Sequence, residues 1–174
     1  MHTKGQSIIV SGGSRGLGLH LCERLLEHGN KVATFARSRT EAMDRLQSAY
    51  GDDFRFTALD ATDEAGVTRL VRDTAKAFGR IHSLVNNAAI GQDQLLMHTD
   101  AQTIRQIIEI NIFGPTILTK AVVKHMLLEG GGNICNISSI CGSRGYAGLT
   151  VYAGSKGSSM IADVLAKVSG KLSR

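Results

Sequence analysis

A glycine-rich turn between a strand-like and a helix-like segment constrains the fold more than any other part of this sequence. The apolar run 7–10 indicates a buried strand, and leucines recur at helical spacing over 17–26. Glycines stand at 12, 16 and 18, where the two segments meet. Backbone N–H groups at the start of such a helix favour a phosphate, and the missing Cβ atoms permit its close approach. The turn therefore predicts a dinucleotide-phosphate site, with an ordinary glycine turn as the alternative.

The rest of the chain repeats the order of strand and then helix. Further strands are expected at 31–36, 54–59, 81–85 and 133–137, and helices at about 40–50, 63–78, 100–128 and from the segment around 152 toward 170. This alternation predicts an α/β fold with a parallel sheet. At 174 residues the chain has the length of one domain, and with the glycine-rich turn this predicts a single dinucleotide-binding domain over 1–174.

Two arginines bear on which nucleotide the turn would bind. In dinucleotide sites an acidic residue after the second strand binds the ribose 2′-hydroxyl, whereas an arginine accommodates a 2′-phosphate. Arg37 occupies that position here, and Arg15 lies inside the glycine turn. Two cations favour NADP over NAD, and the alternative is that both arginines are solvated loop residues.

Polar side chains follow the fourth and fifth strands, and an acid–base pair lies on the last helix. Asn86 and Asn87 end one strand and Ser139 follows the other, so they are expected at the edge of the sheet where ligands bind. Tyr152 and Lys156 are four residues apart and share a helix face. A fixed positive charge beside a phenol favours the phenolate, which suits proton transfer. The alternatives are a solvated helix face and a serine that caps a turn.

Composition narrows the classes of function. No apolar run approaches the length of a membrane span, and the net charge of +5 is spread without a basic cluster, so neither membrane nor nucleic-acid binding is expected. The three cysteines and six histidines are scattered without metal-ligand spacing, so no metal is expected. Scattered thiols also indicate a reducing compartment, and we expect a cytoplasmic protein.

Together these motifs resemble the classical short-chain dehydrogenases/reductases, from Ser7 to the end of the chain. The motifs that carry the resemblance are Gly12-x3-Gly16-x-Gly18, Asp60, Asn86-Asn87-Ala88-Ala89, Asn111, Ser139 and Tyr152-x3-Lys156. The chain departs from the family at Ala89, where glycine is usual, and at Ser11, where threonine is usual. The resemblance implies a Rossmann-like, doubly wound parallel sheet in a three-layer α/β/α fold, with strand order 3-2-1-4-5. It also implies a homodimer or homotetramer.

The resemblance also implies a role for each matching residue. Tyr152 would be the acid–base residue, and Ser139 would polarise the substrate carbonyl. Lys156 would assist the tyrosine and hold the nicotinamide ribose, and Asn111 would anchor a proton-relay water. NADP(H) is expected as the cofactor, in contact with Gly12, Ser14, Arg15, Gly16, Leu17, Gly18, Arg37, Asp60, Ala61, Asn87, Ala88, Ala89, Tyr152 and Lys156.

Within that family, the segment 92–97 resembles the 3-oxoacyl-[acyl-carrier-protein] reductases. We therefore expect NADPH-dependent reduction of a carbonyl to a secondary alcohol, with a 3-oxoacyl thioester as substrate, which an acyl carrier protein could carry. Other small carbonyls or alcohols are alternative substrates. The extended branch of the family, with its sugar epimerases, shares the Tyr/Lys pair but spaces its glycines differently.

Length is the main departure from the family. Members usually continue past the helix that carries the tyrosine, adding a sixth strand, a segment that covers the substrate and a seventh strand. The chain is therefore expected to be C-terminally incomplete, with the strand at 133–137 as an exposed edge. Two alternatives to an enzyme follow, an NADP-binding module without catalysis and a structural subunit.

Overall fold

Five parallel strands form one sheet in the order β3-β2-β1-β4-β5, as the family resemblance implies. The computed structural model describes the backbone of residues 4–166 and the side chains as far as Ser158. The strands are β1 (Ser7–Ser11), β2 (Lys31–Ala36), β3 (Phe54–Ala58), β4 (Ser83–Asn86) and β5 (Asn133–Asn136). They agree with the predicted strands to within two residues at each end.

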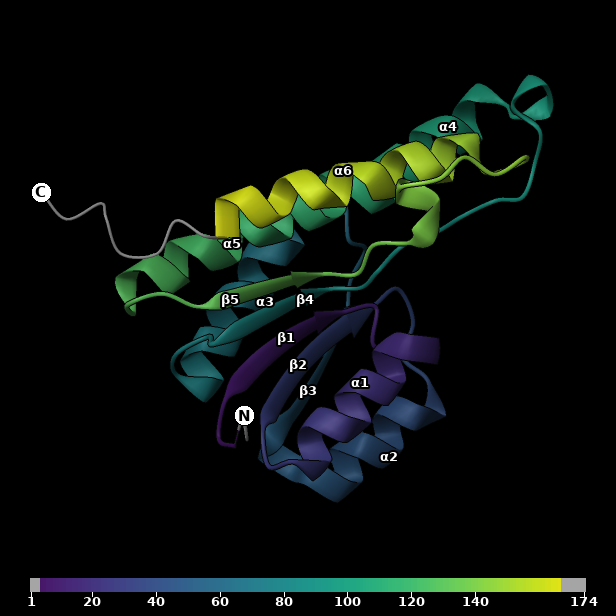
Figure 1. Cartoon of the computed structure of the whole chain (residues 1–174). Helices are drawn as coiled ribbons and strands as arrows, with labels where there is room; N and C mark the ends of the chain where they lie inside the picture. Colours follow the sequence, from purple (N-terminus) through teal and green to yellow (C-terminus); the bar gives the residue numbers. More distant parts are fainter. Residues whose placement is uncertain (1–3, 167–174) are drawn as a thin grey trace, which may run out of the picture.

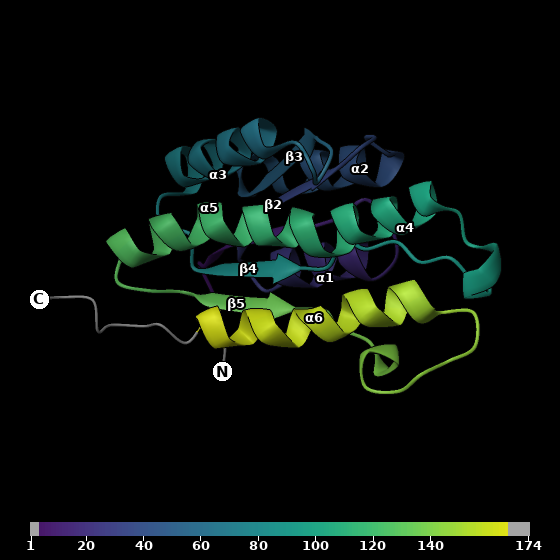
Figure 2. The same ribbon diagram turned by 90° about the horizontal axis from the view of Figure 1, so that it is seen from above.

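Helices cover both faces of the sheet and give three layers (Figure 1). On one face lie α1 (Gly16–Glu27) and α2 (Glu41–Tyr50). The other carries α3 (Glu64–Phe78), α5 (Gly114–Leu128) and α6 (Thr150–Ala166), which lie side by side in Figure 2. Helix α4 (Ala101–Ile108) continues the line of α5 beyond the sheet. The doubly wound α/β/α architecture is therefore confirmed.

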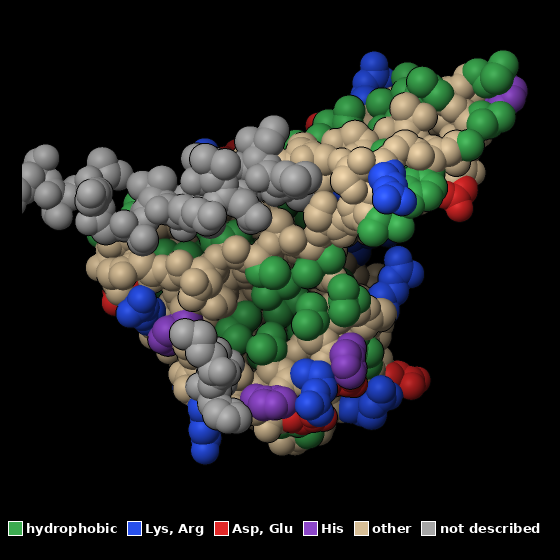
Figure 3. Space-filling view, in the orientation of Figure 1, with side chains coloured by type: hydrophobic (Ala, Val, Ile, Leu, Met, Phe, Trp, Pro, Cys, Tyr) green, Lys and Arg blue, Asp and Glu red, His purple; other side chains and the backbone are tan. Residues whose placement is uncertain are grey.

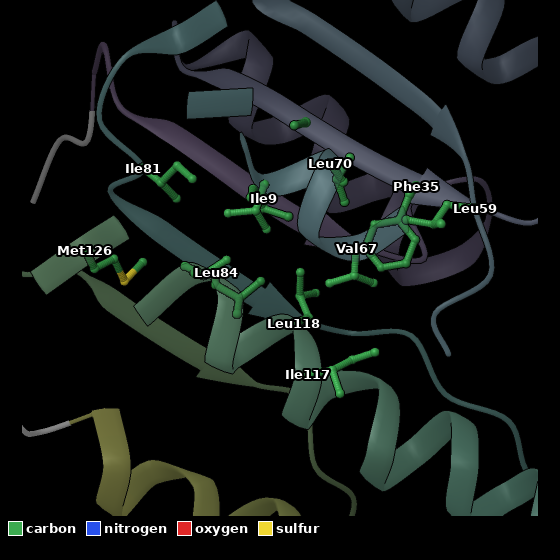
Figure 4. Packing of buried hydrophobic residues seen from close by; sticks show 13 residues of the cluster. Ile9, Phe35, Leu59, Val67, Leu70, Ile81, Leu84, Ile117, Leu118 and Met126 are labelled. Atoms are coloured by element: carbon green, nitrogen blue, oxygen red, sulfur yellow. The ribbon is translucent and has the colours of Figure 1, made fainter. Parts of the chain in front are cut away.

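The two faces of β1 show why the sheet needs helices on both sides. Successive side chains of a strand point to opposite faces, so Ile9 packs into the cluster under α3 and α5 while Ile8 and Val10 pack under α1 and α2. Figure 4 shows Ile9 among the side chains of the first cluster. A strand buried on both faces must be apolar throughout, which explains its continuous hydrophobic run.

Parallel pairing brings the strand tips to one edge. Ile9 of β1 lies opposite Ala33 of β2 and Leu84 of β4. The chain therefore leaves these three strands at the same edge, and the segments that follow them meet there. This edge is where open parallel sheets bind their ligands.

The predicted single helix over 100–128 is wrong in one detail, because a π-helical turn at Glu109–Phe113 separates α4 from α5. In this turn the Gly114 N–H donates to the Glu109 carbonyl, five residues back. Pro115 then falls in the first turn of α5, where a missing N–H is tolerated. The π-helical turn explains why Pro115 does not break the run of helices from α4 to α5. It also buries Asn111, which is 7% exposed.

Strand β5 forms one edge of the sheet. Among residues 4–166, no strand pairs with its second side, as the sequence led us to expect. Helix α6 packs against β5 on one face, and in Figure 3 hydrophobic side chains gather on the opposite face, between α1 and the layer of β5 and α6. None of the helices within the described range is long and apolar enough to cross a membrane.

Replacing Gly13 with alanine is expected to destabilise the fold. A Cβ at Gly13 would collide with the Thr34 hydroxyl and lie 2.8 Å from Cys22 Sγ, all within the α1 side of the core. Overpacking of this kind costs about 1–3 kcal/mol of the free energy of unfolding, measured by urea denaturation. Gly145→Ala, at a position with open space around the glycine, is the control and should stay within about 0.5 kcal/mol of wild type. Equal losses in both variants would contradict this packing.

Acid should destabilise the protein partly through His82. Burial and the nearby Arg80 charge lower the pKa of His82. When neutral, the His82 Nδ1 accepts a hydrogen bond from the Ser7 N–H, with 3.1 Å between the two nitrogens. The unfolded chain therefore binds a proton at His82 more readily than the folded protein does. The stability that neutral His82 contributes is fully present above the ordinary histidine pKa and is lost as the pH falls through the lower pKa of the folded protein. In His82→Gln, the free energy of unfolding should fall less steeply between about pH 7 and 5. The exposed His98→Gln control should keep the wild-type slope.

Candidate active site

Glycine is required for two different reasons where β1 meets α1. Gly12 and Gly16 have φ of +72° and +55°, in the left-handed region that favours glycine. An added Cβ at Gly16 would meet nothing within 4 Å, so its side faces open space. At Gly18 a Cβ would collide with the Gly12 carbonyl. The glycines thus permit both the turn and close packing of α1 on it.

The start of α1 is available to an anion. Helix α1 begins at Gly16, its N-cap residue Arg15 makes no side-chain capping bond, and no acidic side chain lies in its first turn. The first N–H groups of a helix lack intrahelical partners and lie at the positive end of its dipole. These groups therefore suit a phosphate.

Thr34 of β2 holds the glycine turn through two hydrogen bonds. Its buried hydroxyl accepts a bond from the Gly13 N–H at 3.0 Å and donates to the Val10 carbonyl at 2.6 Å. Sequence reasoning missed this residue, because a threonine inside a strand gives no signal beyond strand propensity.

Asn87 supports the turn from the tip of β4. Its Nδ2 donates to the Ser11 carbonyl at 2.9 Å and to the Gly12 carbonyl at 3.3 Å. The Ser11 hydroxyl in turn accepts from the N–H groups of Asn87 and Ala88. Asn86 differs from the sequence expectation, because its Nδ2 points inward and donates to Thr119 of α5 rather than to the ligand edge.

A cleft of about 580 Å³ opens at this edge of the sheet. In the space-filling view, the molecule is hollowed between the part formed by α4 and α6 and the part formed by α1 and α2 (Figure 3). The cleft is lined by all twelve residues that were predicted to bind the nucleotide apart from the Tyr/Lys pair: Gly12, Ser14, Arg15, Gly16, Leu17, Gly18, Arg37, Asp60, Ala61, Asn87, Ala88 and Ala89. The remaining lining residues, which sequence reasoning did not name, are Phe35, Ala36, Ser38, Thr40, Leu59, Ile90 and Ile110.

The charged side chains of the cleft come from its two predicted arginines and one aspartate. Neither Arg15 nor Arg37 forms an ion pair among the described residues. The Asp60 carboxylate accepts bonds from the N–H and hydroxyl of Thr62, which lower its pKa, and the Arg37 charge lowers it further. Arg39 lies outside the lining and is already paired with Asp44 at 2.6 Å. Arg15 and Arg37 are therefore the cations that a bound anion would meet.

Tyr152 lines a second cavity, of about 400 Å³. Ala89 and Ile90 line both this cavity and the cleft, so the two spaces adjoin. The Tyr152 ring packs against Gly91, where an added Cβ would lie 3.1 Å from a ring carbon. The phenol thus stands next to one end of the cleft.

Lys156 lies beside Tyr152, as their spacing predicts. Its Nζ is 5.9 Å from the centroid of the tyrosine ring and donates to the Ile137 carbonyl at 2.7 Å. The side chain is 6% exposed, and burial lowers its pKa. The Lys156 carbonyl accepts a bond from Ser138 at 3.0 Å, so the segment that follows β5 holds both the backbone and the amine of this residue.

Ser139 and Asn111 line neither of these two spaces. The Ser139 hydroxyl, at the tip of β5, accepts a bond from the Cys141 N–H at 3.2 Å. The Asn111 amide bonds the N–H and the carbonyl of Ile90 at 2.8 and 2.7 Å. Asn111 therefore holds a residue that lines both spaces. No group of three or more metal-ligating side chains occurs in the part of the chain that the structure describes.

Comparison with known proteins places this geometry in a family. The family model described as short chain dehydrogenase matches residues 6–169. The NADP-dependent (R)-specific alcohol dehydrogenase of Lentilactobacillus kefiri is 36% identical over 156 residues, which cover 88% of this chain and 62% of that protein. The 3-oxoacyl-[acyl-carrier-protein] reductase FabG of Vibrio cholerae serotype O1 is 34% identical, over 90% of this chain and 64% of its own length.

Solved structures with a similar fold indicate the same family. A short-chain dehydrogenase from Streptomyces avermitilis superposes with a TM-score of 0.86 at 34% identity, over 92% of this chain and 60% of that one. The structure of ElxO with NADP bound gives 0.82 at 32% identity, covering 90% and 64%.

The chain belongs to the short-chain dehydrogenase family of oxidoreductases. It spans about 62% of the length of the curated relatives that it matches.

Proposed function

We propose that the protein is an NADPH-dependent oxidoreductase that reduces a carbonyl to a secondary alcohol, with a 3-oxoacyl thioester as substrate. The observation that carries this proposal is that two spaces adjoin. The cleft lies at the start of α1 and is lined by Arg15 and Arg37. The neighbouring cavity is lined by Tyr152, beside the buried Lys156. The site belongs to one domain, for which we propose the bounds 1–174.

The described residues fit a phosphorylated dinucleotide. The start of α1 would hold the pyrophosphate, and Arg15 and Arg37 would meet a 2′-phosphate. Asp60 and Asn87 would contact the adenosine part, and Lys156 and Tyr152 the nicotinamide ribose. When bound, NADPH would supply the hydride. Three similar proteins carry NADP in their names or titles, which supports this choice.

The protein's own residues would handle the proton and the developing oxyanion. The Tyr152 phenol would donate its proton to the carbonyl oxygen, next to the buried Lys156 amine. The Ser139 hydroxyl accepts its bond from Cys141, so its own proton can be donated to the same oxygen. Asn111 would hold a relay water as well as the Ile90 backbone.

The surface near the cavity suits an acyl chain. Leu95, Leu96 and Met97 are more than half exposed and lie two to four residues after the cavity residue Asp93. The net charge of +5 suits an acidic carrier protein, and relatives named 3-oxoacyl-[acyl-carrier-protein] reductase support this substrate class. Another small carbonyl or alcohol is the alternative substrate.

We also propose a homodimer or homotetramer in the cytoplasm. Ile108, Phe113, Leu127 and Leu128 are exposed along the line of α4 and α5, where helices of two copies could pack. The three cysteines are free, in keeping with a reducing compartment.

A second candidate function is NADP binding without turnover. It is favoured by the position of Ser139, which lines neither the cleft nor the Tyr152 cavity, whereas the residues expected at the nucleotide phosphates line the cleft. Titration that shows NADPH binding, with no NADPH oxidation on a panel of 3-oxoesters, aldehydes and ketones, would select this function over reduction.

Tyr152→Phe should abolish turnover and still allow cofactor binding. Removing a general acid lowers kcat by about 10²–10⁴-fold, measured as NADPH oxidation with ethyl acetoacetate as a simple 3-oxoester. The NADPH dissociation constant should rise by no more than roughly tenfold, because only one hydrogen bond to the ribose is lost and the ring of phenylalanine fills the same place beside Gly91. Tyr146→Phe, at a tyrosine that does not line the cavity, is the control. Undiminished turnover in the Tyr152 variant would rule out the proposed acid.

Arg37→Gln should reduce the preference for NADPH over NADH. Loss of a charged hydrogen bond to a phosphate corresponds to about 1.5–3 kcal/mol, so NADPH affinity should fall by roughly 10–100-fold while NADH affinity changes little. Arg39→Gln is the matched control, because Arg39 is paired with Asp44 outside the cleft. Calorimetric titration that finds the same NADPH/NADH ratio in all three proteins would contradict the assigned role.

A further inference from the structure

A buried serine lies between the two residues of the acid–base pair. Ser155 is 2% exposed on α6. Its hydroxyl donates to the Tyr152 carbonyl at 2.7 Å and accepts a bond from Asn111 Nδ2 at 2.9 Å. A hydroxyl is one of the few groups that can donate and accept at once, and here both capacities are used.

Asn111 extends this link across the site. One hydrogen of its Nδ2 reaches Ser155 and the other reaches the Ile90 carbonyl, while its Oδ1 accepts from the Ile90 N–H. The amide thus uses both of its hydrogens and its oxygen. The chain of bonds runs from α6 through the π-helical turn at Glu109–Phe113 to the segment that follows β4.

The chain of hydrogen bonds from Ser155 through Asn111 ends at the backbone segment beside the Tyr152 phenol. Ile90 lines both the cleft and the cavity, and Gly91 touches the Tyr152 ring. The next residue of α6 is held elsewhere, because Lys156 donates to Ile137 beyond β5. The helix is therefore attached on two sides, by Ser155 to the β4 segment and by Lys156 to the β5 segment.

We propose that Ser155 is a positioning residue, which sets the place of the Tyr152 phenol relative to the cleft through Asn111 and Ile90. It touches neither substrate nor cofactor and acts through the backbone to which Tyr152 belongs. The proposal rests on the proposed carbonyl reduction, in which proton donation requires the phenol at hydrogen-bond distance from the reacting oxygen. Without the hydroxyl, one Asn111 N–H is left buried without a partner, and the amide must move to satisfy it.

The test compares Ser155→Ala with Ser158→Ala in the 174-residue protein. Ser158 lies on the same helix and donates to the Ser155 carbonyl at 2.6 Å, so the control removes a similar serine bond that lies within α6 itself. We expect kcat for ethyl acetoacetate to fall by roughly 10–100-fold in Ser155→Ala, with KM and NADPH affinity within about twofold of wild type. Ser158→Ala should keep the wild-type kcat to within about twofold.

Amide hydrogen exchange of Ile90 gives a readout that does not need turnover. Exchange of the Ile90 N–H, measured by NMR, should accelerate by roughly tenfold in Ser155→Ala and stay unchanged in Ser158→Ala. Equal kcat values in the two variants would overturn the positioning role while leaving the proposed function in place. If the wild type binds NADPH but reduces no carbonyl, the proposed function fails, and unchanged Ile90 exchange in Ser155→Ala would then overturn the link as well.

Discussion

The close contact between the first turn of α1 and the Gly12 carbonyl is the constraint on which the nucleotide cleft depends. Gly18 leaves room for that carbonyl, and Asn87 and Thr34 hold the turn from the neighbouring strands. Because hydrogen bonds with Thr34 and Asn87 fix the turn, the start of α1 lines the cleft in a fixed position. A phosphate site built in this way costs little ordering when the ligand binds.

The acid–base side of the site depends on a different device, the π-helical turn between α4 and α5. That turn buries Asn111 and aims its amide at the segment after β4 and at α6. Irregular helical turns of this kind are frequent at functional sites, because they direct a side chain that a regular helix would point elsewhere. The cleft and the cavity, which share Ala89 and Ile90 in their linings, are thus each held by a separate network of hydrogen bonds.

Sequence patterns predicted the fold, and the residues expected to bind the nucleotide lie together around one cleft, because both results depend on local signals. Glycines 12, 16 and 18 require special backbone geometry at their own positions, and the apolar run of β1 requires burial on both faces. The roles of Thr34 and Ser155 could not be predicted, because each depends on partners 21 to 44 residues away in the chain. Their residue types are common in strands and helices and carry no pattern of their own. The π-helical turn was not predicted, because it interrupts a segment, 100–128, whose apolar spacing indicates one continuous helix.

An NMR titration of the protein with NADPH tests most directly whether the cleft binds the nucleotide through the start of α1. We expect the amide signals of Gly16 and Leu17 to shift and saturate with NADPH, together with signals of Arg37 and Ala88 around the same cleft. NADH should produce the same shifts only at higher concentration. Unchanged signals at Gly16 and Leu17 at saturating NADPH, or shifts confined to residues outside the cleft, would contradict this account.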